Sequence, residues 1–465
     1  MVVRMTKSDF ASQREKDAAD QTQVVHDLLK TIQHFFGSLE RLFAPVHDPR
    51  DASHIIYSQV ALAFSALLLF GCRLGARRQI NTKLRKNGAS AQKFQQLFGV
   101  PDCPHGDTLN AWCQRVAVAE VQTVVSGTVA ALIRQRVWDA QRLLNFYYVV
   151  TIDGTGLFVF KQRHCAHCLT RTIHGVTQYY HPVLEAKLIA PTGLVCSMLT
   201  EFIENPEPNV SKQDCELKAF VRLTSRLKQR FPRLPICLSL DGLYADGPVF
   251  ARCEAYDWKY MIVLTDDDLP TVNREFAALL PLAPENHLSL TLGRQREIQQ
   301  EFRWVEQIVY RDSEQRSHTL SVLACHETKP RTDADTLQHT RFKWLTNISV
   351  TAKRVQALAT HGGRLRWKTE NEGFNVQKHQ GYALEHTYST DWHAAQVLYL
   401  LLQLAHLLMQ LLERGSLFRQ AFPQGVGSGK DLAFRLLEAW RNACLQLQAL
   451  QRLLRQRIQI RFDTS

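Results

Sequence analysis

The middle of the chain reads Tyr147-Tyr148-Val149-Val150-Thr151-Ile152-Asp153-Gly154-Thr155, an apolar run that closes on an aspartate and a glycine. Farther on, Leu234-Pro235-Ile236-Cys237-Leu238-Ser239-Leu240-Asp241-Gly242 repeats the same design. Short apolar runs bounded by turn residues are typical of buried strands. We therefore expect two strands that each end in an aspartate at the working edge of a sheet.

A third stretch places a glutamate in a helical setting, Arg366-Trp367-Lys368-Thr369-Glu370-Asn371-Glu372. Arg366 and Glu370 are four positions apart, so they share one face if the segment is helical. Glu372 is a rival for Glu370, because it lies only two positions away. Two strand-end aspartates and one helical glutamate can converge on a pair of divalent cations.

Three acids in this arrangement suit magnesium. Mg²⁺ prefers oxygen ligands and keeps several waters, so one or two carboxylates for each ion make a workable site when phosphate fills the rest. In two-metal catalysis the ions lie roughly 3.5–4 Å apart, one activating the attacking oxygen and the other stabilising the leaving oxygen. We expect Mg²⁺ as the cofactor, with Mn²⁺ as a substitute, and Asp153 as the ligand that both ions share.

Each acid also has an ordinary explanation. An Asp-Gly pair after a strand is most often a plain turn, which would account for Asp153 and Asp241 separately. Arg366 with Glu370 is by itself an exposed ion pair worth about 0.2–0.5 kcal/mol. The occurrence of all three acids together, in this order, favours the metal site.

In these stretches the chain resembles the DDE transposases of bacterial insertion sequences, whose ribonuclease-H-like core carries a Tyr-x2-Arg-x3-Glu-x6-Lys signature. The resemblance covers about residues 146–390, and it is most specific at Asp241-Gly242-Leu243-Tyr244-Ala245 and at Arg366-Trp367-Lys368-Thr369-Glu370. It implies that Asp153, Asp241 and Glu370 are the catalytic acids and the metal ligands, and that Arg366 is the signature arginine.

Two positions depart from the signature. Gly363 stands at its tyrosine, and Gln377 stands at its lysine with Lys378 directly after. The resemblance implies that three basic side chains engage the DNA backbone near the cleaved strand. These side chains are Arg366, Lys368 and Lys378.

The activity that the resemblance implies is cut-and-paste transposition at the terminal inverted repeats of the chain's own element. Water attacks the phosphodiester at the element boundary, and the freed 3′ hydroxyl then attacks target DNA. Related enzymes pass through a hairpinned end, act as homodimers on DNA and stack an aromatic side chain on a flipped base, for which Trp304 is the candidate. Two alternatives stay open: a ribonuclease-H-like metal nuclease without strand transfer, and a catalytically silent DNA-binding regulator.

The charge of the chain agrees with a polyanionic partner. Lys and Arg number 56 against 44 Asp and Glu, a formal net charge of +12. From Arg73 to Lys93 the chain carries seven basic residues and no acid. We expect Arg77, Arg78 and Lys83 to contact DNA phosphate. A solvated helix face is the alternative explanation.

The chain divides into five segments by pattern. Residues 1–140 are a helical DNA-binding region, 141–267 and 341–392 are two parts of a catalytic core, 268–340 are an inserted strand-rich subdomain, and 393–465 are helical. Core strands are expected at 146–152, 183–189, 195–202, 236–240 and 260–264. Antiparallel strands, a helix and a further strand occur in the order that a ribonuclease-H-like core requires. The expected fold class is α/β, with that core and its strand-rich insertion flanked by N- and C-terminal helical regions.

No segment favours a membrane or secretion. The first residues mix charges of both signs and have no hydrophobic signal core. Val60 to Phe70 is apolar but much shorter than the ~20 residues that a span requires. Eleven scattered cysteines are typical of cytosolic thiols. We expect a cytoplasmic protein that contacts no membrane.

Histidines and cysteines crowd one short segment. They are His164, Cys165, His167, Cys168, His174 and His181. Cys165-x2-Cys168 has the ligand spacing of a zinc knuckle. No second Cys-x2-Cys or spaced histidine pair completes a standard pattern, so ordinary loop thiols and imidazoles are the first interpretation and structural Zn²⁺ is the second.

Overall fold

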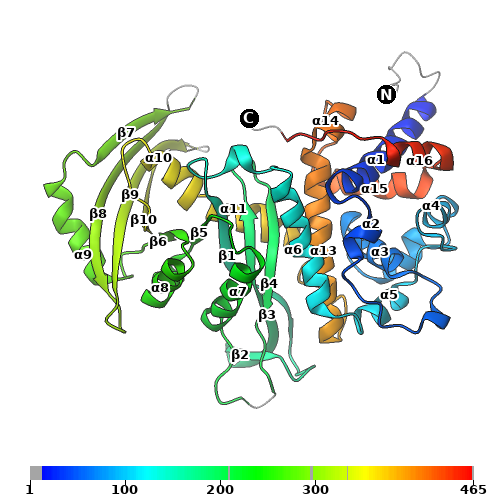
Figure 1. The fold of residues 1–465 in the computed structure, drawn as a ribbon, viewed down its shortest axis with the longest axis horizontal. Helices are drawn as coiled ribbons and strands as arrows, with labels where there is room; N and C mark the ends of the chain where they lie inside the picture. The colour runs from blue at the N-terminus through cyan, green and yellow to red at the C-terminus, as the bar shows by residue number, and fades with distance from the viewer. Residues whose placement is uncertain (1–12, 208–209, 294–296, 332–333, 463–465) are drawn as a thin grey trace.

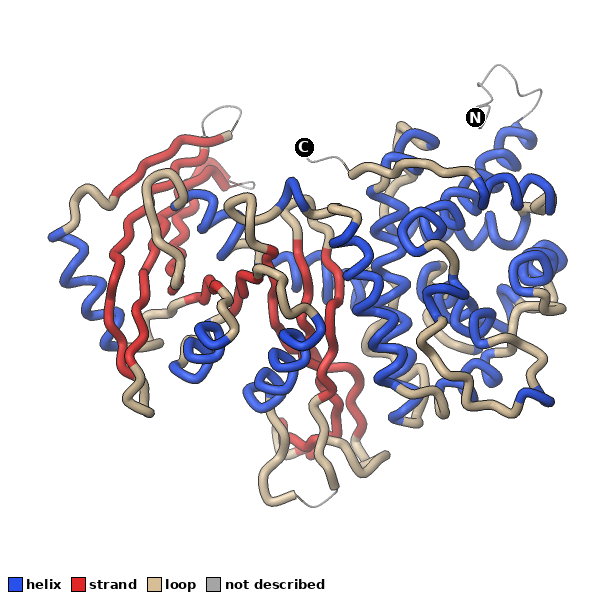
Figure 2. Tube along the Cα trace, in the orientation of Figure 1, coloured by secondary structure: helices blue, strands red, loops and turns tan. Residues whose placement is uncertain are grey.

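The computed structural model describes residues 13–207, 210–293, 297–331 and 334–462. In this part of the chain a mixed sheet of ten strands occupies one half of the molecule and a body of helices the other (Figure 1). Figure 2 shows the same division by secondary structure, with further helices lying against the sheet. The fold class is therefore α/β, as expected.

The sheet follows the order β2-β3-β1-β5-β6-β10-β9-β8-β7. The strand β4 stands outside this path and pairs antiparallel with β3. Its strands are β1 (Tyr148–Phe160), β2 (Leu169–Ile173), β3 (Val176–Ile189), β4 (Val195–Phe202), β5 (Ile236–Leu240), β6 (Lys259–Val263), β7 (His287–Leu292), β8 (Ile298–Arg311), β9 (Ser317–Arg331) and β10 (Ala334–Thr346). The strands expected at 195–202 and 236–240 are confirmed with those bounds. The other three expected core strands are present with shifted bounds.

Strand β1 lies between β3 and β5. It pairs antiparallel with β3 and parallel with β5, and β5 in turn pairs parallel with β6. Parallel neighbours need a crossover connection, and helices supply it here: α7 (Glu216–Arg230) leads into β5 and α8 (Gly247–Ala255) leads into β6. Apolar residues at helical spacing explain the helix α7. Phe220, Leu223 and Leu227 recur on one side of it and are buried against the sheet.

One expectation about β1 is wrong. The strand does not end at Asp153 and Gly154 but continues to Phe160. The pairing of β1 with β5 ends just before Asp153. The pairing of β1 with β3 continues, with Glu185 opposite Asp153, and it keeps the later residues of β1 in the sheet. Asp153 therefore lies inside a strand, at the point where the parallel ladder ends.

The inserted segment extends the same sheet. β10 pairs antiparallel with β6, and β9, β8 and β7 follow as antiparallel neighbours. The helix α9 (Pro270–Leu279) precedes β7 along the chain. The boundary expected at residue 340 falls inside β10, because this one strand pairs with both the core and the insertion.

The N- and C-terminal helical regions form one body. The N-terminal helices are α1 (Gln13–Phe36), α2 (Leu39–Phe43), α3 (Gln59–Gly71), α4 (Gly88–Phe98), α5 (Gly106–Cys113) and α6 (Val118–Arg134). The C-terminal helices are α13 (Trp392–Arg414), α14 (Ser416–Ala421), α15 (Gly429–Asn442) and α16 (Leu447–Arg455). Trp440 of α15 lies 5.3 Å from the ring of Phe64 and 6.0 Å from that of Phe94, so the two ends of the chain share a core.

The helix α13 is the apolar centre of this body. Among the described residues it is the single helix that is long and apolar enough to cross a membrane, and its apolar window is 100% buried. The helices α5 and α6 pass the same test only as a pair bent by 101°. Complete burial inside the protein is what a core helix of this composition shows.

A run of short helical turns at residues 355–379, here named the crossing helix, lies over the sheet. It comprises α10 (Val355–Ala357), η7 (Leu358–Gly363), α11 (Arg366–Lys368), η8 (Thr369–Asn375) and α12 (Val376–His379). Ser239 of β5 donates a hydrogen bond to the carbonyl of Gly362 at 2.8 Å, and Thr369 is hydrogen-bonded to Thr151 of β1. The crossing helix therefore passes over β5 and then β1.

Candidate active site

The two aspartates lie on neighbouring strands in matching register. The last ladder pair between β1 and β5 joins Thr151 to Ser239. Asp153 and Asp241 each follow two positions later, and side chains alternate along a strand, so both aspartates lie on the face of that pair. Asp241 keeps an extended backbone, with φ −83° and ψ 179°. Because paired strands lie ~4.8 Å apart, the two carboxylates are neighbours.

The crossing helix covers this same face of the sheet. Its contacts with Thr151 and Ser239 place it directly beside the aspartates. Nη1 of Arg366 lies 3.9 Å from Oδ2 of Asp153. Glu370 is half-buried and stands one turn after Arg366, and positions four apart share a face of a helix. The spacing therefore predicts that Glu370 lies on the Arg366 side of the crossing helix.

Glu372 points to the other side. Lys368 donates a hydrogen bond to Oε1 of Glu372 at 2.8 Å. Lys368 follows Arg366 by two positions, about 200° around a helix, so this pair faces away from Asp153. Glu372 also lines a cavity together with Arg414 of α13. Lys368 and the cavity of Arg414 therefore engage Glu372, and helical spacing favours Glu370 as the acid on the side of the aspartates.

A carboxylate that the sequence patterns did not single out joins the group. Glu216 opens α7, and the hydroxyl of Tyr244 donates to its Oε1 at 2.7 Å. A Cβ at Gly154 would lie 2.8 Å from Glu216 Oε2, so the glycine beside Asp153 makes room for this acid. Acidic residues are common in the first turn of helices, and nothing local separates Glu216 from those.

Burial and mutual repulsion shift the protonation of these acids. Burial raises the pKa of Asp153 to about 6; the positive charge of Arg366 opposes this rise, while Asp241 and Glu216 add to it. Burial likewise raises the pKa of Glu216, and the hydrogen bond from Tyr244 opposes that rise. Charged carboxylates are therefore costly here without a further cation.

The donor set fits a hard divalent cation. Asp153, Asp241, Glu370 and Glu216 offer carboxylate oxygens, the ligands that Mg²⁺ and Mn²⁺ prefer. Arg366 is the cation that the structure places against Asp153, and one guanidinium does not balance the acids around it. A bound divalent cation would relieve the repulsion that raises the pKa of Asp153.

The other basic candidates at this site already have partners. Lys368 binds Glu372, and Lys378 lies 3.0 Å from Glu385. To bind DNA, Lys368 would have to release Glu372, and Lys378 would have to release Glu385, before contacting a phosphate. Arg366 has a 15% exposed side chain and keeps a buried Nε without a hydrogen-bond partner, so it is the basic residue most directly available at the acids.

One aromatic expectation needs correction. Trp304 is 2% exposed and belongs to a core cluster with Phe302, Leu323 and Trp344, because β8 turns this side of the strand toward the crossing helix. Its ring is covered and offers no surface to a base. Trp367, by contrast, is 51% exposed beside Arg366.

The basic segment 73–93 divides between surface and core. Arg78 and Lys83 are exposed, and Arg77 lies within 3.3 Å of the carbonyl of Gly106. Lys93 is completely buried and donates to backbone carbonyls of the C-terminal region, among them that of Trp440 at 2.8 Å. Burial lowers its pKa to about 8. Lys93 thus stabilises the joint between the two ends of the chain and is not a DNA contact.

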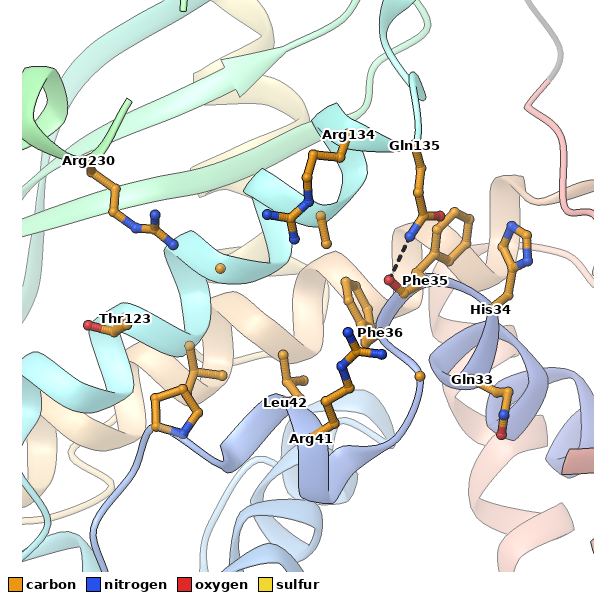
Figure 3. Close-up of a pocket in the computed structure, with 15 residues that line it drawn as sticks. Gln33, His34, Phe35, Phe36, Arg41, Leu42, Thr123, Arg134, Gln135 and Arg230 are labelled. Atoms are coloured by element: carbon orange, nitrogen blue, oxygen red, sulfur yellow. Dashed lines mark hydrogen bonds between the residues drawn. The ribbon is translucent and has the colours of Figure 1, made fainter. Parts of the chain in front are cut away.

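A cavity of about 500 Å³ offers a second basic surface, between α1, α2, α6 and the end of α7. Arg41, Arg134 and Arg230 line it, and all three are exposed (Figure 3). The described residues that line it include no acid. Arginine binds phosphate through paired donors. This cavity is therefore a second candidate site for an anionic partner, besides the segment around Arg78.

No protein-family model matches this chain, and no curated protein matches its sequence. The fold and the site therefore define its class by themselves: an α/β protein in which carboxylates from two neighbouring strands and from the start of α7 gather at one place on a sheet.

The raised pKa of Asp153 predicts a pH-dependent stability in metal-free protein. The pKa of this carboxyl is about 3.9 in the unfolded chain and about 6 in the folded protein. Between these two values the folded state binds more protons than the unfolded state. The contribution of Asp153 to the free energy of unfolding is therefore fully present below about pH 4 and is lost as the pH rises through 6. We expect Asp153→Asn to be more stable than the wild type at pH 8, by on the order of 2–3 kcal/mol, and the difference to vanish near pH 4. Urea unfolding in EDTA measures it; a difference that does not change with pH would contradict the shift.

Proposed function

We propose that the protein is a metal-dependent DNA transposase that cuts and joins phosphodiester bonds at the ends of its own element. The observation that carries the proposal is the placement of Asp153 and Asp241 in register on neighbouring parallel strands, under a helix that presents Arg366. These two acids lie far apart in the sequence, and they are the two aspartates that the DDE resemblance implies. Helical spacing adds Glu370, one turn after Arg366, as the third acid.

The topology supports a ribonuclease-H-like core as part of this proposal. The strands β1, β3 and β4 pair antiparallel, with the short β2 between β1 and β3 along the chain. They precede the helix α7 and then β5, which returns parallel to β1. This is the order expected from the sequence. The strands from β7 to β10 extend the core on the far side of β6 as an insertion between the second and third acids.

The residues of the site have distinct roles in the proposed reaction. Asp153, Asp241 and Glu370 hold divalent cations, and Glu216 is a further carboxylate whose orientation Tyr244 fixes. Bound cations supply activation of the attacking oxygen and stabilisation of the leaving oxygen. Arg366, which lies 3.9 Å from Asp153, would bind a non-bridging phosphate oxygen of the DNA.

The direct test uses DNA that flanks the reading frame of this protein. We expect the purified chain with Mg²⁺ to produce 3′ hydroxyl ends at the element boundaries and then joined products with a target plasmid, and EDTA to prevent both. Cutting without joined products would support the hydrolytic nuclease instead. Binding without any cutting would support the silent regulator.

The surroundings of the reaction are part of the proposal. The partners are the terminal inverted repeats and target DNA, and the active form on DNA is a homodimer in the cytoplasm. Analytical ultracentrifugation with and without the repeat DNA tests the dimer. A complex that contains one chain for each pair of ends would contradict it.

The exposed part of the basic segment gives a separate prediction. Replacing Arg77, Arg78 and Lys83 with Ala should weaken DNA binding and reduce the slope of log affinity against log salt by about 0.9 for each DNA phosphate that the variant no longer neutralises. The matched control is Arg274→Ala with Arg303→Ala, which removes exposed positive charge at the opposite end of the sheet. Equal slopes for the wild type and the triple variant would move the DNA-binding surface to another part, such as the cavity around Arg134.

A further inference from the structure

Four side chains beyond the acid site converge on one point. His164, Cys165 and Cys168 lie between β1 and β2, and His181 lies on β3. One ligand atom from each of them is within 4.8 Å of the other three. His167, which shares the segment, turns away and is hydrogen-bonded to the carbonyl of Asn205 at 2.9 Å.

Hydrogen bonds among the four side chains do not explain this convergence. Nε2 of His181 lies 3.2 Å from Sγ of Cys165, 3.5 Å from Sγ of Cys168 and 3.2 Å from Nε2 of His164. A ring nitrogen carries either one proton or one lone pair, so it makes a single hydrogen bond. A cation between these atoms accounts for all three short approaches.

The spacing has the dimensions of a tetrahedral zinc site. With Zn–S near 2.3 Å and Zn–N near 2.0–2.1 Å, ligand atoms lie roughly 3.3–3.8 Å apart. Here they are separated by 3.2–3.5 Å where His181 is one member, and Sγ of Cys168 lies 3.7 Å from Nε2 of His164. The two sulfurs are 3.2 Å apart and both thiols are free, whereas a disulfide requires about 2.05 Å.

We propose that His164, Cys165, Cys168 and His181 bind one structural Zn²⁺ ion. Four protein ligands close the coordination sphere, which is the property of structural and not of catalytic zinc sites. Two thiolates neutralise the charge of the ion, and binding releases the thiol protons to solvent. This site is separate from the acids and does not depend on the proposed DNA chemistry.

The zinc site fastens the far end of the strand that carries Asp153. It joins the loop after β1 to β3, and the ring of His181 is stacked on Trp392 at 3.7 Å and 14°. Trp392 is the first residue of α13, so the site also connects the sheet to the helical body. Asn205 supports the loop by donating a hydrogen bond to the carbonyl of Cys168 at 3.0 Å.

The experiment is metal analysis of the full chain purified without chelators. We expect about one zinc per chain, and the absorption bands of tetrahedral thiolate-bound cobalt after replacement of zinc by Co²⁺. Cys165→Ser should lower zinc affinity by more than the 10–100-fold that loss of an outer-shell partner typically costs. Cys215→Ser, at an exposed thiol outside the cluster, is the matched control and should keep full zinc content.

The result is decisive in either direction. Less than about a tenth of a zinc ion per chain, a cobalt spectrum without thiolate bands, or a Cys165–Cys168 disulfide found by alkylation of unreduced protein would each overturn the proposal. Unchanged zinc in Cys165→Ser would overturn it as well. If Cys165→Ser does not fold, the metal content and cobalt spectrum of the wild-type chain still decide the question.

Discussion

Asp153→Asn and Asp241→Asn should each abolish Mg²⁺-dependent cleavage while leaving DNA binding nearly unchanged. An amide is a poor ligand for a hard cation. A bound metal ion stabilises the transition state by several kcal/mol. Loss of about 4 kcal/mol of this stabilisation lowers the cleavage rate roughly a thousandfold. The two variants keep the size and shape of the side chains, so the strands β1 and β5 should pair as before. Single-turnover cleavage and equilibrium binding of the same end fragment measure the two effects.

Asp51→Asn is the matched control. Asp51 is exposed in the helical body and caps a short helical turn, a role that asparagine performs equally well. The Asp51→Asn variant should cleave DNA at the wild-type rate. Near-normal cleavage by either Asp153→Asn or Asp241→Asn would remove these acids from the reaction, and weak binding by both would show that they act on folding or recognition instead.

The second large effect separates two neighbouring glutamates. Glu370→Gln should be inactive even with Mn²⁺, because Glu370 follows by one helical turn Arg366, which lies against Asp153. Glu372→Gln should keep substantial strand transfer, because this carboxylate binds Lys368 on the opposite side. Loss of that half-exposed ion pair costs at most about 1 kcal/mol. Strand-transfer assays with Mg²⁺ and with Mn²⁺ provide the comparison.

The two glutamate variants serve as controls for each other, since they remove the same charge from the same helix. If Glu372→Gln were inactive and Glu370→Gln active, the signature would be shifted by two residues. The roles of Arg366 and Lys378 would then have to be withdrawn. Equal losses in both variants, together with equal losses of stability, would indicate a packing role for the crossing helix.

Local sequence was sufficient to locate the two aspartates and the strand β5. The apolar runs before Asp153 and Asp241 are short and bounded by turn residues, and such patterns depend only on neighbours along the chain. The same reasoning placed β1 but ended it too early, because the pairing that prolongs β1 to Phe160 comes from β3. A strand's length is decided by its partners as well as by its own residues.

Contacts between distant segments bury side chains that no local pattern marks as buried. Lys93 ends the basic segment, but its ammonium group binds the carbonyl of Ala443, 350 positions away. Trp304 looked like an aromatic for a flipped base, but the crossing helix and the neighbouring strands bury it. No local pattern distinguishes a lysine or tryptophan that will be covered from one that will stay exposed.

The sequence by itself determined that this is an α/β protein with aspartates at the ends of two apolar runs and a basic, helical N-terminal region, because strand periodicity, turn residues and charge are properties of short segments. Only the tertiary structure decided that Asp153 and Asp241 share a face beneath Arg366, that Glu216 joins them, and that four of the clustered His and Cys side chains meet at one point. These arrangements depend on strand register and on helix packing, which bring together residues that the chain itself separates.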